Sequence, residues 1–185
     1  MLPIIQTKRL ILRTIQLSDA ADMYEYAKTP DVGPVAGWEP HPDLNHTLMI
    51  INMFKMSAAK TGLGVFAIVL KENKKMIGTI ELFNHYQHFK AELGYALNKD
   101  YWGKGYVTEA AKGVLKWAFE DLALKRVEVN LFVDNYRSER VCQKLGMHYE
   151  GIKKKGYMRY DGKIFDEKVY HLTDDEYFKK GGEDL

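Results

Sequence analysis

The chain has 185 residues, of which 46% are hydrophobic and 28% charged, and its formal net charge is +2. This length allows one domain with a substantial core, so we expect a single domain over residues 1–185. The small net charge gives no bulk drive towards nucleic acid or membrane, and no apolar run approaches the roughly 18 residues that a membrane helix needs. The N-terminal stretch also lacks the apolar region of a signal peptide, which predicts a cytoplasmic protein.

The first third of the chain predicts one strand and two helices. The run RLILRTI is typical of a strand, and Ser18 with the following acidic residues is typical of a capped helix start. Thr29-Pro30 ends that helix, and a Pro/Gly-rich segment runs from there to Pro42. A second helix is expected over about Thr47 to Lys60, with Gly62 just past its end.

The middle of the chain predicts three strands joined by hairpins, then a helix and a further strand. The three strands are VFAIVL from Val65, MIGTIELF from Met76 and AELGYAL from Ala91. Apolar residues recur at helical spacing from Val107 to Leu122, and alternation returns from Val127 to Val133. A crossover helix of this length implies that the strands on either side of it run parallel.

The last third predicts a short helix and a hairpin. The helix covers about Arg137 to Leu145 and ends at Gly146, and strands near 148–160 and 164–172 meet at the turn Asp161-Gly162. The whole pattern predicts a mixed α/β fold.

The cysteine and histidine patterns exclude two kinds of site. Cys142 is the single cysteine, so no internal disulfide can form. The six histidines are scattered, and no Cys/His cluster has the spacing of metal ligands, so we expect no metal.

The segment YWGKGYVTEA, residues 101–110, lies between a predicted strand and the start of a predicted helix. Gly103 and Gly105 allow backbone N–H groups to approach a ligand closely, and a helix N-terminus favours phosphate oxygens. The alternative is a glycine turn that only connects the two elements. A Walker A loop is absent from the sequence, and Thr108 stands where a dinucleotide fingerprint has its third glycine.

This segment resembles the acetyl-CoA pyrophosphate loop of the GNAT N-acetyltransferases, whose general form is Q/R-x-x-G-x-G/A. Trp102 and Val107 depart from that form, but W-G-K-G-Y-x-T-E-A is similar to the Rim-type branch, which acetylates ribosomal-protein N-termini. The resemblance continues through RVEVNLFVDNYRSERVCQKLGMHYEG and covers nearly the whole chain. It implies a central mixed twisted sheet of about seven strands with four helices and a V-shaped splay between the two parallel central strands.

The same resemblance implies acetyl-CoA, or CoA, as the cosubstrate and assigns the residues that bind it. Asn135 and Ser138 would lie beside pantetheine, although a simple helix cap is the alternative role for Asn135. Lys99, Lys104, Arg137, Arg140 and Lys144 fall in segments expected around the groove and could meet its phosphates. The cofactor-binding residues are expected to be Tyr95, Ala96, Leu97, Trp102, Gly103, Lys104, Gly105, Tyr106, Val107, Thr108, Asn135 and Ser138.

Two catalytic roles are also implied. Glu92 shares a strand face with Gly94, Ala96 and Asn98, and the family places a carboxylate there as the general base. Glu81 in the neighbouring strand is the second candidate, and a solvated strand glutamate is the alternative for Glu92.

The general acid is expected to differ from the common one. The usual tyrosine of the family is replaced by Cys142, so the acid role passes to Ser138, in keeping with the serine of the Rim-type branch. Cys142 itself is expected to be a small buried helix residue and no nucleophile.

These features predict an acetyl-CoA-dependent N-acetyltransferase whose acceptor is a protein or peptide N-terminal α-amine. The acceptor cleft is expected between the loop with Trp38 and His41, the first two helices and the Asp161-Gly162 hairpin. Two alternatives stay open: acetylation of a small amine such as an antibiotic, an amino-acid analogue or a polyamine, and a CoA-binding regulator without turnover. No nucleic-acid or membrane partner is expected, and both a monomer and a homodimer are compatible with the sequence.

Overall fold

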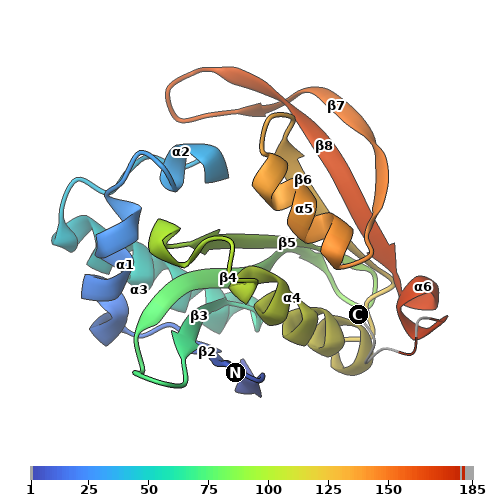
Figure 1. Ribbon diagram of the computed structural model, residues 1–185, viewed down its shortest axis with the longest axis horizontal. Helices are drawn as coiled ribbons and strands as arrows, with labels where there is room; N and C mark the ends of the chain where they lie inside the picture. The colour runs from blue at the N-terminus through green and yellow to red at the C-terminus, as the bar shows by residue number, and fades with distance from the viewer. Residues whose placement is uncertain (1, 180, 182–185) are drawn as a thin grey trace. The chain divides into compact units, whose positions relative to one another are not determined.

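The computed structural model of the protein describes residues 2–179 and residue 181. Within them the strands form one mixed sheet in the order β1-β2-β3-β4-β5-β6-β8-β7 (Figure 1). The strands are β1 Ile5–Gln6, β2 Leu10–Thr14, β3 Val65–Leu70, β4 Met76–Tyr86, β5 Lys90–Leu97, β6 Arg126–Phe132, β7 His148–Met158 and β8 Ile164–Thr173. The helices are α1 Ala20–Ala27, α2 Gly33–Ala36, α3 Leu44–Thr61, α4 Tyr106–Lys116, α5 Tyr136–Lys144 and α6 Asp174–Lys179, with short η1 Leu17–Asp19, η2 Lys99–Tyr101 and η3 Trp117–Asp121.

The chain divides into two compact units. The first comprises Met1–Leu82 and Gly94–Ala110, and the second comprises Phe83–Leu93 and Ala111–Leu185. A single domain over residues 1–185 therefore stays a prediction, and each unit is described by itself.

The first unit is an antiparallel sheet with helices packed on it. Strand β3 is buried along its whole length, as expected for the apolar run VFAIVL, and it pairs with β2 and β4. The α1 residues Met23 and Tyr26 and the α3 residue Ile51 belong to its core. Asp43 caps the start of helix α3, where its carboxylate accepts a hydrogen bond from the His46 N–H at 2.8 Å, and Gly62 caps the end of the helix.

The second unit is built on the pairs β6–β8 and β7–β8, both antiparallel. Helix α5 packs against β6 through its apolar face, where Cys142 and Leu145 are fully buried. Glu139, three residues before Cys142 on the same helix, accepts hydrogen bonds from Lys168 and Tyr170 of β8, each at 2.8 Å. The apolar face and these polar contacts together fix the position of α5 on the sheet.

The predicted mixed α/β fold is confirmed, with three corrections. The described residues form eight strands and six helices, where about seven and four were expected. The unpredicted elements β1, α2 and α6 have two, four and six residues, too few to produce a readable period. Strand β4 extends to Tyr86, and Asn98 lies past the end of β5, where its side chain caps η2.

The predicted crossover is also confirmed. Strands β5 and β6 pair in parallel over Lys90–Glu92 and Arg126–Glu128, with α4 between them in the chain. The V-shaped splay beyond this pairing stays a prediction.

Candidate active site

The glycine-rich segment of the first unit connects η2 to α4. Trp102 follows η2 in an extended conformation, and its indole N–H donates to the Leu97 carbonyl at 2.8 Å. Gly103 and Gly105 have φ of 76° and 77°, the left-handed region that favours glycine. Helix α4 begins directly after them at Tyr106. The segment is therefore held at its start by Trp102 and turned by two glycines onto a helix N-terminus.

The space beside the two glycines is open. A Cβ atom built on Gly103 would meet no atom within 4 Å, and one on Gly105 would meet only the Arg9 Nη2, at 3.7 Å. The Glu109 N–H donates to the Gly105 carbonyl at 3.0 Å. The first N–H groups of an α-helix have no partner within the helix, so they are available to a ligand. A left-handed backbone, open space and the positive end of a helix suit a pyrophosphate group.

The end of β5 approaches β4 closely within the first unit. A Cβ atom on Gly78 would lie 2.3 Å from the Ala96 carbonyl oxygen, so only glycine fits at this position of β4. The Asn98 N–H also donates to the Ile77 carbonyl, at 2.8 Å. Gly78, which the sequence analysis did not single out, thus allows the backbone of Ala96 and Leu97 to lie directly against β4.

Glu92 lies in the second unit and is held by two amides. Its Oε1 accepts from the Asn84 Nδ2 at 2.9 Å, and its Oε2 accepts from the Asn130 Nδ2 at 2.7 Å. The Asn130 Oδ1 in turn accepts from the Lys153 Nζ at 3.1 Å. Each carboxylate oxygen keeps a further lone pair, so Glu92 is oriented and still able to accept a proton.

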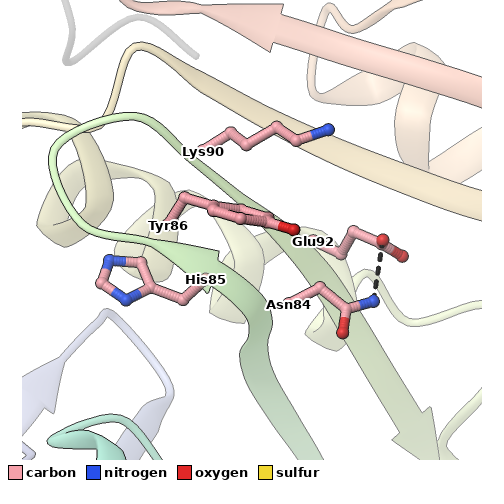
Figure 2. Close-up of a pocket in the computed structure, with 5 residues that line it drawn as sticks. All are labelled: Asn84, His85, Tyr86, Lys90 and Glu92. Atoms are coloured by element: carbon pink, nitrogen blue, oxygen red, sulfur yellow. Dashed lines mark hydrogen bonds between the residues drawn. The ribbon is translucent and has the colours of Figure 1, made fainter.

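A pocket of about 320 Å³ adjoins Glu92. Figure 2 shows the Asn84 amide bonded to Glu92 and the hydroxyl end of Tyr86 directed towards the same carboxylate. The residues that line the pocket are Asn84, His85, Tyr86, Lys90 and Glu92. A small polar group therefore has room beside the predicted base.

Glu167 of β8 is a second carboxylate in this part of the second unit. Its exposed fraction is 8%, and burial raises its pKa, with a further rise from the negative charge of Glu92 and an opposing effect of Lys153. A Cβ atom on Gly156 would lie 2.7 Å from its Oε2, so the glycine makes room for the carboxylate. Sequence reasoning missed Glu167 because strand alternation alone does not distinguish it from an exposed strand glutamate.

Glu81, the alternative base, lies in the first unit. It is on β4 opposite Val65 of β3, and burial raises the pKa of its carboxyl. Because general bases often have a raised pKa, Glu81 stays the alternative candidate beside Glu92.

Helix α5 carries the other predicted residues of the second unit. The Asn135 side chain accepts from the Ser138 N–H at 3.2 Å, so the helix-cap role of Asn135 is confirmed. Ser138 is half-buried in the first turn of α5. Cys142 is fully buried, as predicted for a packing residue.

The loop with Trp38 and His41 lies in the first unit. His41 is 6% exposed, its Nδ1 lies 2.9 Å from the Thr47 Oγ1, and burial lowers its pKa to about 4. Its ring packs against Trp38 with centroids 5.3 Å apart. The His41 ring therefore anchors this loop to α3. The backbone N–H of His41 donates to the Ala27 carbonyl and anchors the loop to α1.

Comparison with known proteins shows that the chain is an acetyltransferase. Residues 9–148 match the family model described as the acetyltransferase (GNAT) domain, and the chain belongs to this family. A Bacillus subtilis protein described as uncharacterized N-acetyltransferase YoaA is 31% identical over 175 residues, covering 94% of this chain and 98% of the relative. The [ribosomal protein uS5]-alanine N-acetyltransferase of Escherichia coli is 27% identical over 177 residues, covering 90% and 89%.

Solved structures share the fold. The crystal structure of a GNAT-family acetyltransferase from Bacillus anthracis superimposes with a TM-score of 0.81 at 27% identity, covering 94% of this chain and 100% of that one. The protein is thus an acetyltransferase of the GNAT family. The microcin C7 self-immunity acetyltransferase MccE shares the fold with a TM-score of 0.79 at 20% identity, and its crystal structure is a complex with acetyl-CoA and AMP. Among the described residues no group of His, Cys, Asp and Glu could hold a metal ion, and no helix is long and apolar enough to cross a membrane.

Proposed function

We propose that the protein transfers the acetyl group of acetyl-CoA to the α-amine of a protein or peptide N-terminus, with Glu92 as the general base. The observation that carries this proposal is the fixed carboxylate of Glu92 beside an open polar pocket. The similarity to the [ribosomal protein uS5]-alanine N-acetyltransferase of Escherichia coli supports a protein acceptor.

The chemistry requires little of the base. Acetyl-CoA supplies an activated thioester whose thiol is a good leaving group, with a reference pKa of about 8.5. An α-amine has a reference pKa of about 8, so roughly a tenth of it is already neutral at pH 7. Glu92 needs only to accept the amine proton, directly or through one water molecule. Its two amide partners keep the carboxylate in one orientation while this happens.

The donor would be held by the residues assigned above. The N–H groups of Gly103 to Thr108 would bind the pyrophosphate, and the backbone of Tyr95–Leu97 would pair with pantetheine and donate an N–H to the thioester carbonyl oxygen. Asn135 would combine its capping role with a place beside pantetheine, and Ser138 would protonate the departing thiolate. A serine at this position would assist only modestly, since the thiolate is already a tolerable leaving group.

A small-molecule amine is the second candidate acceptor. The pocket beside Glu92 has a volume of about 320 Å³, which is enough to hold a compact amine. Lys90, which also lines the pocket, argues against a polyamine because its ammonium would repel a second cationic nitrogen.

One screen separates these acceptors. The protein is incubated with acetyl-CoA and a panel of peptides with different N-terminal residues, each matched by the same peptide with a blocked α-amine, together with small amines. Acetylation is scored by mass and by free thiol release. Acetylation of the peptides with a free α-amine, and of none with a blocked α-amine, supports the proposal. Transfer only to small amines replaces the acceptor class, and binding of CoA without transfer to any amine makes the protein a CoA-binding regulator.

A further inference from the structure

The side chain of Arg9 braces the glycine-rich loop of the first unit. Arg9 precedes β2 and reaches across to residues about 95 positions later in the chain, where its Nη1 donates to the Lys104 carbonyl at 3.0 Å. Its guanidinium carbon lies 4.2 Å from the centroid of the Tyr106 ring. One side chain thus contacts both neighbours of Gly105.

Glu109, in the first turn of α4, fixes the position of Arg9. The Arg9 Nε donates to Oε2 at 2.6 Å, and the Arg9 backbone N–H donates to Oε1 at 2.7 Å. The Thr7 hydroxyl donates to the same Oε1 at 2.5 Å. Partial burial acts to raise the pKa of Glu109, but the hydrogen bonds from Thr7 and Arg9 together outweigh it and lower the pKa. Glu109 is therefore a charged partner that ties the chain before β2 to the start of α4.

The contact with the Lys104 carbonyl has a directional consequence. The Lys104–Gly105 peptide is trans, as are all the described peptide bonds. In a trans peptide the C=O group and the following N–H point in opposite directions. Because Arg9 holds the carbonyl on its own side, the Gly105 N–H points away from Arg9. The Tyr106 N–H is set in the same way, because the Gly105 carbonyl accepts from the Glu109 N–H inside the helix.

We propose that Arg9, held by Glu109, is a positioning residue that presents the Gly105 N–H to the pyrophosphate of acetyl-CoA. The inference rests on the proposed role of the loop as the pyrophosphate site. A glycine at φ 77° has a wide choice of conformations. Without Arg9, the Lys104–Gly105 peptide can rotate and turn the Lys104 carbonyl oxygen towards the phosphate. The carbonyl oxygen and the phosphate oxygens would then repel each other. Arg9 would therefore act on donor affinity and leave the chemical step unchanged.

The test compares Arg9→Met with Arg13→Met. Arg13 is a matched control in the same unit, because its guanidinium also bridges a carboxylate, that of Asp19 at 2.7 and 2.8 Å, and a carbonyl, that of Thr14 at 3.2 Å. Arg9→Met should raise the KM for acetyl-CoA by about ten- to a hundredfold, the range for losing a charge-assisted hydrogen bond. Its kcat and its KM for the amine should stay within about twofold, and Arg13→Met should leave all three constants within about twofold.

The affinities of CoA and its fragments distinguish a positioning role of Arg9 from a merely structural one. CoA and dephospho-CoA both carry the pyrophosphate, and pantetheine does not. Calorimetry or competitive inhibition should show equal weakening of CoA and dephospho-CoA in Arg9→Met and no change for pantetheine. Arg9→Lys should recover part of the loss, since an ammonium keeps the charge but not the fork that reaches Glu109 and Lys104 together. Glu109→Gln should act in the same direction, and its effect should not add fully to that of Arg9→Met.

The inference would be overturned by a folded Arg9→Met protein with an unchanged KM for acetyl-CoA, or by equal losses of all constants in Arg9→Met and Arg13→Met. A loss that extends equally to pantetheine would also overturn it. A Gly105→Ala protein with unchanged CoA affinity would instead remove the proposed pyrophosphate site itself, so the two failures are distinguishable.

Discussion

Replacing Glu92 by glutamine tests the general base with little change of shape. The glutamine Oε1 can accept from the Asn130 Nδ2, whose own carbonyl oxygen stays bonded to Lys153. The glutamine amide then faces Asn84, which is exposed and can turn its side chain to present an oxygen. Both hydrogen bonds survive, so we expect the free energy of unfolding to change by no more than about 1 kcal/mol.

The effect on turnover should be much larger. Loss of a general base lowers the rate by about 10² to 10⁴, or about 3 to 5 kcal/mol in the activation free energy. The deficit at pH 7 should shrink as pH rises, because more of an α-amine with a reference pKa of about 8 is then neutral without help. A glutamate with only a structural role would give a loss that pH does not repair.

The assay is a pH–rate profile of the parent, Glu92→Gln and Glu81→Gln, with the melting temperature and CoA affinity of each protein measured in parallel. Glu81→Gln is the matched control, since it removes a strand carboxylate whose pKa burial raises. A Glu92→Gln protein that is folded and as fast as the parent at pH 7 would refute the reasoning. If Glu81→Gln alone is slow, the base role passes to Glu81.

Three further predictions concern the loop, the cysteine and the buried histidine. Gly105→Ala should weaken CoA binding in calorimetry. Gly62, at φ 75° in open space, is the control: both substitutions should lower the free energy of unfolding by about 1 to 2 kcal/mol, but Gly62→Ala should leave CoA binding unchanged. Cys142→Ala should retain most activity and form the same products, and mass detection of an acetyl group on Cys142 in the parent would contradict this. Folding lowers the pKa of His41 from 6.5 to about 4, so its contribution of about 3 kcal/mol is fully present above pH 6.5 and is lost as pH falls towards 4. Urea unfolding between pH 7 and 4 should show this slope in the parent, and an equal slope in His41→Asn would count against it.

The sequence by itself determined the helices and strands in which apolar residues recur with a clear period. Strand β3 follows the run VFAIVL residue for residue, and the helix expected from Arg137 appears as α5 with Asn135 as its cap. These predictions succeed because the 2.0 and 3.6 periods of apolar residues reflect the burial of one face. The glycine loop was also found, since a glycine pair between a strand and a helix is a local signal.

Only the tertiary structure decided which distant residues hold the site. Asn130 meets Glu92 because β5 pairs with β6 in a register that no local pattern encodes, and Asn84 reaches the same carboxylate from β4, the neighbour of β5 on its other side. Arg9 reaches Lys104 and Glu109 from the other end of the first unit, and nothing near Arg9 in the sequence indicates this. Periodicity specifies which face of an element is buried, whereas the partners of a polar side chain depend on how strands far apart in the chain are aligned.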